Sequence, residues 1–560
     1  MKRKIKLILT LLMLVMIIPL SSCFFKPEND NDIVLTTKNV EFKNLTPSYD
    51  VKNTNVDLYF YENGNVPLMD VSTFYNMLEG LYVTDGRELN TNTLFNRLYI
   101  VNKSNSYARV IFDWKYNTVT FKNTLSAYGM HSHGSIDFNA HYDIKTLKSI
   151  STLEINYNLG DYGVDILYYN GKVLMPVSFI NFMNDDYYNV LYNGNKLYGY
   201  YYADSDAVIK SVYTEIYDNA SMKGDAPRDI REEVKNEVLF LLNEKYGLKN
   251  YARVDDYLDY IGEENWNRYI NGTVEERTDF IYELIDITLN DPHSRLVKLP
   301  FYRPSGKTYS NAVGERYTNI SKTFSTLREA RKSAENYDQP IYYKGNTVFV
   351  TFDGFDLGTR DEVYDGNSYK ADAYKVDTAA LVYKALSETK NSHPEVTNVV
   401  FDVSANGGGY VAAMYKLLTF ICKKPIIGQK ISEDAIELYT LVGDTNLDGN
   451  YGDETFDFNY YILESEGTFS AANAFSCFAK YSGSVKTIGK RSGGGMCSVT
   501  AYVLTDGTML NLSNRTRMAA GIENEKTYTV IEIEGGAPVD YPLEYADFCN
   551  LDKILEIINA

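Results

Sequence analysis

The hydrophobic pattern of the first two hundred residues is typical of strands and turns. Apolar and polar residues alternate in "VDLYFYENGNVPLMDVSTFYNML", which begins at Val56, and in "VDILYYNGKVLMPVSFINFM", which begins at Val164. Each segment predicts a strand, an Asn-Gly turn, a second strand with proline and a short amphipathic helix. Because the two segments are similar, residues 41–215 are predicted to form a β-rich region of two related units.

The period becomes helical from about Asp225, where apolar residues recur every three or four positions in "RDIREEVKNEVLFLL". A further helix is expected to begin at Thr273, because "TVEE" is a capping box, and to stop at the proline of "LNDPHSRL". Residues 225–300 are therefore predicted to be a helical subdomain, with His293 on an exposed corner where its last helix ends.

Strands and helices alternate from about residue 340 to the end of the chain. The strand-like runs are "NTVFVTF", "NVVFDV", "YYILE" and "VKTIG", and the helix-like runs between them are "DTAALVYKALSETKN", "VAAMYKLLTFIC" and "AANAFSCFAKY". This repetition predicts an α/β core over residues 340–560.

Length and charge limit the classes of function. With 560 residues the chain is long enough for three or four domains with real cores. The formal net charge of -19 argues against nucleic acid as a partner.

The N-terminus predicts export and lipid anchoring. A basic start and the apolar run "LILTLLMLVMIIPL" are typical of a signal peptide over residues 1–22. "LSSC" resembles a bacterial lipobox, in which Cys23 is lipidated and becomes the first mature residue, and residues 23–40 then form a polar tether. The protein is thus expected outside the cytoplasm, anchored to the bacterial cell membrane. The alternative is an ordinary secretory signal with an incidental cysteine.

Four more cysteines and a cluster of histidines carry no clear metal pattern. Cys422, Cys477, Cys497 and Cys549 lack CxxC spacing, so zinc is not expected, and they could be paired or buried as free thiols. The histidines of "HSHGSIDFNAH" favour a polar loop over a metal site.

The segment "YYILESEGTFSAANAF" is the strongest candidate for chemistry. An apolar strand leads into a corner at Ser470 and then into a helix, which is the architecture that presents a nucleophilic serine. The alternative is that Ser470 only caps the helix. The Gly-rich turn "DVSANGGGY" follows another buried strand, so Gly407 or Gly408, together with Ala471, could donate N–H groups to an oxyanion. That turn could equally be tight for conformational reasons alone.

Two further groups would complete a serine hydrolase site. His293 is a candidate general base, because histidine titrates near neutral pH. A carboxylate in "TVIEIEGGAPVDYPLEY", either Glu532 or Glu534, could orient that histidine.

A possible structural calcium site precedes the nucleophile strand. In "DTNLDGNYGDE" the spacing of Asp444, Asn446 and Asp448 matches the first half of an EF-hand-like loop. Its twelfth position is Thr455 and not glutamate, so an acidic hairpin loop is an equal alternative. No other cofactor is required by the sequence.

The motifs together resemble the tail-specific, or C-terminal-processing, serine peptidases, in particular their tricorn-like branch. "LNDPHSRL", "FDVSANGGG", "TFSAANAF", "IGKRSGGG" and "EIEGGAPVDYPL" look like that branch's motifs, in the same order. Three departures stand out: Ser404 where arginine is usual, Asn473 where an acidic residue is usual, and Val539 inserted before the aspartate. No stretch between His293 and Gly345 resembles a PDZ domain.

The resemblance implies a crotonase-like (ClpP/crotonase-type) α/β core with a helical subdomain, and endopeptidase or tail-trimming activity on proteins or peptides. It implies Ser470 as nucleophile, His293 as base and Glu532 as the supporting carboxylate. The β-rich units resemble stalk-like modules of Gram-positive surface enzymes. One branch of the family uses a lysine base about 25 residues after the serine, but that position here is Gly495, and Lys490 is the nearest lysine. The alternative function is an inactive surface lipoprotein that binds peptide or glycan.

Overall fold

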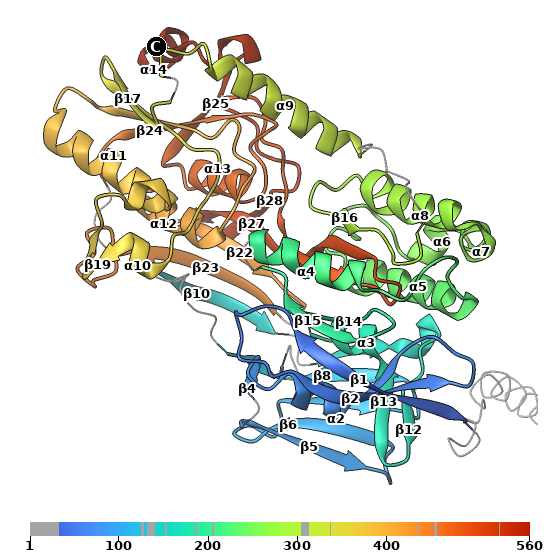
Figure 1. The fold of residues 1–560 in the computed structure, drawn as a ribbon. Coiled ribbons are helices and arrows are strands. Elements are labelled where there is room, and N and C mark those ends of the chain that lie inside the picture. Colours follow the sequence, from blue (N-terminus) through green and yellow to red (C-terminus); the bar gives the residue numbers. More distant parts are fainter. Residues whose placement is uncertain are drawn as a thin grey trace, which may run out of the picture.

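The computed structural model describes residues 33–560 except 84, 125–127, 132–140, 152–153, 185–187, 204–205, 304–312, 337, 434, 453–455 and 526. The signal peptide, Cys23 and most of the expected tether therefore lie outside the described residues. Figure 1 shows the N-terminal sheets at one end of the molecule, the α/β core at the other, and an antiparallel sheet between them.

The two related N-terminal units share one sheet. Its strand order is β12 (Leu167–Tyr169), β13 (Lys172–Pro176), β3 (Leu68–Asp70), β2 (Thr54–Tyr61), β1 (Leu35–Asn44), β15 (Leu197–Tyr201) and β14 (Tyr188–Tyr192). The helices α2 (Val71–Met77) and α3 (Val177–Phe182) follow β3 and β13 directly. These two strands pair antiparallel, with Met69 opposite Met175, so corresponding parts of the two units contact each other.

A second N-terminal sheet is a meander of short strands. It contains β5 (Arg87–Asn92), β6 (Arg97–Asn102), β7 (Arg109–Asp113), β8 (Thr118–Lys122) and β11 (Glu154–Asn158). A small pair, β4 (Tyr82–Val83) and β9 (Gly129–Met130), and the short helical turn η2 (Leu159–Tyr162) complete this region.

The helical subdomain begins close to the predicted position. It contains α5 (Arg228–Phe240), η3 (Leu241–Lys245), α6 (Tyr257–Ile261), α7 (Glu263–Asn271), α8 (Val274–Tyr282) and η4 (Glu283–Thr288). The capping box at Thr273 is present, with Thr273 and Glu276 bonding each other's backbone N–H groups. Two more helices flank the subdomain in the chain: α4 (Asp206–Asp218), inside the region predicted to be β-rich, and α9 (Glu315–Arg331).

The α/β core is a six-stranded sheet covered by helices. Its order is β17 (Ile341–Lys344), β18 (Thr347–Thr351), β21 (Asn398–Asp402), β24 (Asn459–Glu464), β25 (Val485–Gly489) and β29 (Tyr541–Pro542), parallel except for β17. Val399, Phe401 and Ile462 are fully buried, as expected for parallel strands covered on both faces. The core helices are α11 (Thr378–Ser392), α12 (Val411–Ile421), α13 (Ala471–Tyr481) and α14 (Leu551–Asn559).

Smaller core elements connect these strands and helices. They are α10 (Arg360–Val363), β19 (Tyr364–Asp365), β20 (Ser368–Tyr369), η5 (Ala373–Lys375) and η6 (Tyr545–Asp547).

An antiparallel sheet joins the regions that the sequence pattern separates. It runs β10 (Tyr142–Ser151), β23 (Ala435–Gly443), β22 (Ile427–Ile431), β27 (Met509–Asn524) and β16 (Arg295–Lys298), and β26 (Cys497–Val503) and β28 (Thr527–Glu532) also pair with β27. β10 belongs to the N-terminal region in sequence, yet it pairs along its whole length with β23 of the core. A boundary near residue 215 therefore does not separate two independent sheets.

A buried polar junction also fixes the N-terminal region to the core. The Glu237 carboxylate on α5 accepts hydrogen bonds from the N–H and Oγ1 of Thr505, and Thr505 Oγ1 lies 3.2 Å from Ser178 Oγ on α3. Glu237 is fully buried, and this burial raises its pKa well above the ordinary value. Thr505, in the turn of the β26–β27 hairpin, thus contacts both the helical subdomain and an N-terminal unit.

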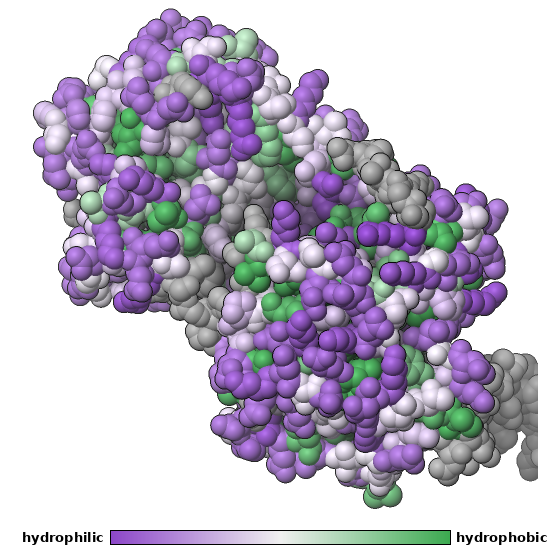
Figure 2. All heavy atoms as spheres, in the orientation of Figure 1, coloured by the Kyte–Doolittle hydropathy of each residue, from purple (hydrophilic) through white to green (hydrophobic). Residues whose placement is uncertain are grey.

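The four cysteines of the last quarter of the chain are not paired with one another. Cys422, Cys477, Cys497 and Cys549 are all free thiols, and the first three are buried. In the described part of the chain, no helix is both long and apolar enough to span a membrane. Hydrophilic side chains cover most of the face shown in Figure 2, and apolar residues are scattered over it.

The loop predicted as a calcium site is organised by hydrogen bonds from N–H groups. The Asp444 carboxylate is buried and accepts from the N–H groups of Asp448 and Gly449 at 3.0 Å, and it lies 3.1 Å from Nδ1 of His141. Asn446 Oδ1 accepts from the Asp448 N–H. These hydrogen bonds already occupy Asp444 and Asn446 within the loop, whose acidic end at residues 453–455 lies outside the described residues. Within the described ranges, no three His, Cys, Asp or Glu side chains converge to hold a metal ion.

We therefore expect calcium to leave the melting temperature of the chelated protein unchanged. Asp444→Ala should destabilise the protein by about 1–3 kcal/mol, because the two hydrogen bonds that this buried carboxylate accepts from the loop are lost, whereas Asp448→Ala should change stability by less than about 0.5 kcal/mol. Thermal unfolding with and without millimolar calcium measures both effects. A calcium-dependent rise in melting temperature that disappears in Asp448→Ala would reinstate the calcium site.

Candidate active site

Ser470 stands at a strained corner between β24 and α13. Its backbone has φ 59 and ψ -123, a conformation that a residue with a side chain adopts only when its surroundings enforce it. The Ser470 N–H donates to the Gly494 carbonyl at 2.8 Å. The Ser470 side chain makes no capping hydrogen bond to α13, although the residue occupies the N-cap position. The interpretation of Ser470 as a plain helix cap is therefore wrong.

Two glycines allow the surrounding segments to approach this corner. A Cβ on Gly408 would lie 2.7 Å from Ser470 Cβ and 3.0 Å from the Ala471 nitrogen. A Cβ on Gly495 would lie 3.1 Å from the Ser470 nitrogen and within 2.8 Å of the Phe469 ring. Since such contacts are too short for any side chain, both positions require glycine.

The Gly-rich turn lies against Ser470, but the N–H of Gly408 is not available to a substrate. It donates to Asn406 Oδ1 at 2.9 Å in a buried hydrogen bond. Gly407 lies at the exposed tip of the turn, where a Cβ would meet the Phe324 ring and not Ser470. The expected donors Gly407 and Gly408 therefore do not fit the geometry.

Gly409 and Ala471 are better placed to stabilise an oxyanion. Phe355, which follows β18, donates its N–H to the Gly408 carbonyl and accepts from the Tyr410 N–H. Gly409 lies between these two residues, opposite Phe355, and because backbone groups alternate in direction along an extended segment, its N–H points to the side away from Phe355. β21 lies between β18 and β24, and that side is therefore the side of Ser470. Among the described residues, neither the Gly409 N–H nor the Ala471 N–H donates a hydrogen bond.

His293 lies beside the corner on the loop between η4 and β16. Its ring centroid is 4.6 Å from that of Phe469, the residue before Ser470. The His293 N–H donates to Asp291 Oδ1 at 3.1 Å, and Asp291 Oδ2 accepts from Ser294 Oγ, which in turn accepts from the Ser513 N–H of β27. No hydrogen bond joins His293 and Ser470 in the described structure, so their proximity rests on the Phe469 contact.

The environment of His293 keeps its imidazole neutral. Burial lowers its pKa below 6.5, the nearby Asp291 carboxylate opposes this, and the Arg316 cation lowers the pKa further. Nδ1 is buried and has no hydrogen-bond partner among the described residues. A neutral imidazole can accept a proton, as a general base must.

The structure separates the two candidate carboxylates. Glu532 ends β28 with its side chain exposed, whereas Glu534, just past the strand, is 1 % exposed. Glu534 Oε1 lies 2.8 Å from Arg316 Nη1, and Oε2 accepts from the Met496 N–H at 2.8 Å. The choice of Glu532 is therefore not supported, because the buried carboxylate next to the Gly493–Gly495 segment is that of Glu534.

Lys490 and Asn473 have other partners. Lys490 Nζ forms an ion pair with Glu544 at 2.5 Å. Asn473 is buried, donates to the Ile533 carbonyl and accepts from Ser492 Oγ, so it fastens α13 to the segment that carries Glu534. A neutral amide suits this position because it donates and accepts at once.

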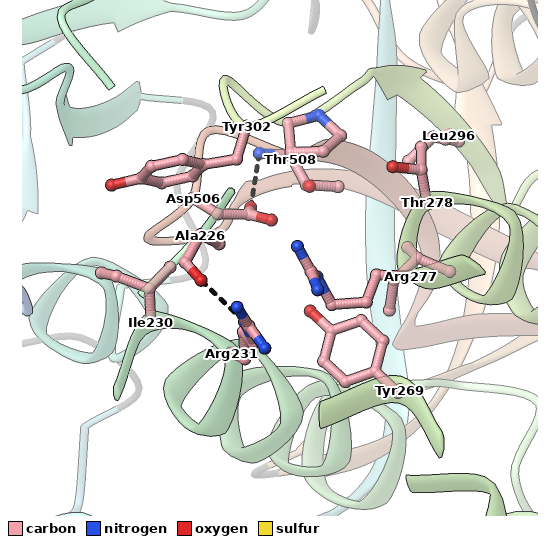
Figure 3. A pocket seen from close by; sticks show the side chains of 12 residues that line it. Ala226, Ile230, Arg231, Tyr269, Arg277, Thr278, Leu296, Tyr302, Asp506 and Thr508 are labelled. Atoms are coloured by element: carbon pink, nitrogen blue, oxygen red, sulfur yellow. Dashed lines mark hydrogen bonds between the residues drawn. The ribbon is translucent and has the colours of Figure 1, made fainter. Parts of the chain in front are cut away.

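A separate enclosed cavity lies in the helical subdomain. Figure 3 shows Arg231, Tyr269, Arg277 and Asp506 around it, and none of the residues that line it belongs to the Ser470 site. Both arginines are already bonded, Arg231 to the Ala226 carbonyl and Arg277 to the Asp225 carboxylate. The cavity therefore belongs to the packing of the subdomain.

Sequence reasoning missed three residues of the site: Asp291, Arg316 and Gly409. Asp291 is two positions before His293, and Gly409 is next to the glycines that were chosen. Arg316 carries no local signal, because only the fold brings α9 next to Glu534.

Comparison with known proteins gives one family match and several distant structural matches. Residues 365–526 match the model of Peptidase family S41. Curated protein sequences give no match. A candidate peptidase from Parabacteroides merdae matches with 14% identity over 60% of this chain and 98% of its own, at a TM-score of 0.40.

Two other solved structures show a weaker likeness. A lipoprotein from Streptococcus agalactiae matches with 12% identity over 57% of this chain and 93% of its own, at a TM-score of 0.33. The photosystem II D1 C-terminal processing protease matches with 17% identity over 40% of this chain and 51% of its own, at a TM-score of 0.27. By the family match, residues 365–526 form a serine-type peptidase domain that is similar to family S41.

Proposed function

We propose that the protein is an extracytoplasmic, lipid-anchored serine endopeptidase or tail-processing peptidase of the tricorn-like branch, with Ser470 as nucleophile. The observation that carries the assignment of Ser470 is its strained backbone, which presents an uncapped hydroxyl beside two N–H groups without acceptors. Strain of this kind costs about 1–3 kcal/mol and is found mainly at functional sites. A crotonase-like arrangement of the core is part of the same proposal.

In the proposed reaction Ser470 Oγ bonds to the carbonyl carbon of a peptide while its proton passes to Nε2 of His293. The N–H groups of Ala471 and Gly409 stabilise the resulting oxyanion. His293 then donates the proton to the leaving amine as the C–N bond breaks, and water releases the acyl group by the same two steps. Glu534 replaces Glu532 as the supporting carboxylate, and it acts through its ion pair with Arg316, the cation that lowers the pKa of His293.

The base is a histidine and not a lysine. Lys490 is held by Glu544, and the residue 25 positions after Ser470 is Gly495, whose close contact with Ser470 excludes a side chain. His293 needs no large pKa shift to act near neutral pH, whereas a lysine would need strong desolvation.

We expect His293→Ala to lower the hydrolysis of labelled casein by at least about a hundredfold, the usual scale for a general base, and Ser470→Ala to abolish both hydrolysis and labelling by a fluorophosphonate probe. Lys490→Ala is the matched control and should retain activity. Because burial lowers the pKa of His293, activity should fall as pH drops through a value below 6.5.

Activity that survives His293→Ala but is lost in Lys490→Ala would refute the histidine base. A folded wild-type protein that neither labels nor hydrolyses casein would favour a binding role over catalysis.

The two carboxylates provide a second test. Glu534→Gln should lower kcat by at least about tenfold, because a buried carboxylate that orients or stabilises the base is lost. Glu532→Gln, two residues away on the exposed end of β28, should leave kcat unchanged. Steady-state kinetics measures kcat for both variants. An equal loss of kcat in the two, or a larger loss in Glu532→Gln, would contradict the role of Glu534.

Lipid anchoring at Cys23 has its own test. The full chain, expressed in a bacterium, should incorporate radiolabelled palmitate and fractionate with membranes, since several acyl chains anchor a protein stably. Cys23→Ser should lose the label and appear in the soluble fraction. Membrane association of Cys23→Ser, or its cleavage at another site, would point to a different export signal.

A further inference from the structure

The Gly-rich turn departs from the family signature at Ser404, yet a guanidinium group lies beside it. This group belongs to Arg331, the last residue of α9, a helix that extends from the helical subdomain to the core in Figure 1. Arg331 Nη2 lies 2.9 Å from Asp402 Oδ1 and 3.3 Å from Ser404 Oγ. Arg331 Nη1 lies 2.6 Å from Asp353 Oδ1.

Arg331 is a charged group held in a largely buried place. Its side chain is 15% exposed and that of Asp402 is 13% exposed. Burial lowers the pKa of Arg331, but Asp402 and Asp353 raise it by more, so the guanidinium stays charged. Asp402 ends β21 and Asp353 follows β18, and one cation therefore links the ends of two neighbouring core strands. Removing one partner from such a pair leaves an uncompensated charge.

A chain of hydrogen bonds leads from this ion pair to Ser470. Asp402 Oδ1 accepts from both the N–H and the Oγ of Ser404, at 3.0 and 2.6 Å. Two residues later, Asn406 donates to the Phe352 carbonyl and accepts from the Gly408 N–H. Gly408 then touches Ser470, and the Asn406 carbonyl accepts from the N–H of Phe469. The turn is thus anchored by Arg331 at its start and contacts the nucleophile at its end.

We propose that Arg331 is a positioning residue for catalysis: it supplies from α9 the guanidinium that the family signature has at position 404, and so holds residues 402–409 with the Gly409 N–H facing the oxyanion. This inference rests on the proposed peptidase function. Arg328, one turn earlier on α9, offers a matched control. Its side chain is 52% exposed, it reaches Asp353 at 3.3 Å, and it contacts the turn through a long hydrogen bond of 3.5 Å to the Ala405 carbonyl.

The test is a set of variants in which the guanidinium is removed from position 331 and then restored at position 404. Arg331→Ala should lower kcat for labelled casein by at least about tenfold with little change in KM, because one oxyanion donor is displaced and substrate binding is not. Arg328→Ala should behave like wild type. The double variant Arg331→Ala with Ser404→Arg should recover most of kcat, and millimolar guanidinium ion should partly rescue Arg331→Ala alone.

Amide hydrogen exchange provides a readout that does not depend on activity. Exchange over residues 402–409 should quicken in Arg331→Ala, stay slow in Arg328→Ala and slow again in the double variant or with guanidinium. The proposal is overturned if Arg331→Ala keeps kcat and protection, or if neither form of rescue restores them. If wild type fails to cleave casein, the peptidase function fails, while exchange still decides whether Arg331 holds the turn.

Discussion

The backbone conformation of Ser470 is the constraint on which the rest of the site depends. With φ 59 the residue cannot continue β24 or begin α13 in a relaxed way, so neighbouring segments must hold it. The Gly494 carbonyl accepts its N–H, and Gly408 and Gly495 allow the Gly-rich turn and the Gly493–Gly495 segment to pass within contact distance. Two segments far apart in sequence thus hold one strained residue in a conformation that costs about 1–3 kcal/mol.

Helix α9 supplies a cation to each side of this corner. Arg316 near its start pairs with the buried Glu534, and Arg331 at its end pairs with Asp402 below the Gly-rich turn. Both carboxylates would be costly to bury without a partner. The same helix therefore compensates two buried charges, Glu534 beside the Gly493–Gly495 segment and Asp402 at the start of the Gly-rich turn. Both of these segments lie against Ser470.

The order of strands, helices and motifs in the core could be predicted from sequence because each depends on local signals. The buried strand before the Gly-rich turn, the strand–corner–helix at Ser470 and the capping box at Thr273 are all of this kind. Sequence-based predictions were wrong where residues with the same local pattern differ only in their long-range contacts. Glu532 and Glu534 are two residues apart and look alike in sequence, and only the pairing of β28 and the approach of Arg316 distinguish them.

Long-range contacts also decide the roles of Gly408 and Gly409, the partners of the Asp444 loop, and the sheet to which β10 belongs. The Gly408 N–H is taken by Asn406, and the Asp444 carboxylate by backbone N–H groups and His141. β10 pairs with β23, almost three hundred residues later in the chain. Contacts of this range have no local signature, so sequence periodicity could not reveal them.

The central claim is that Ser470 attacks a carbonyl whose oxygen is held by the N–H groups of Ala471 and Gly409. The most direct measurement is a crystal structure of the protein with a peptide aldehyde, whose hemiacetal oxygen mimics the oxyanion. The account predicts a covalent bond from Ser470 Oγ, with that oxygen within hydrogen-bond distance of both N–H groups. An adduct on another residue, or an oxygen that binds neither group, would contradict it.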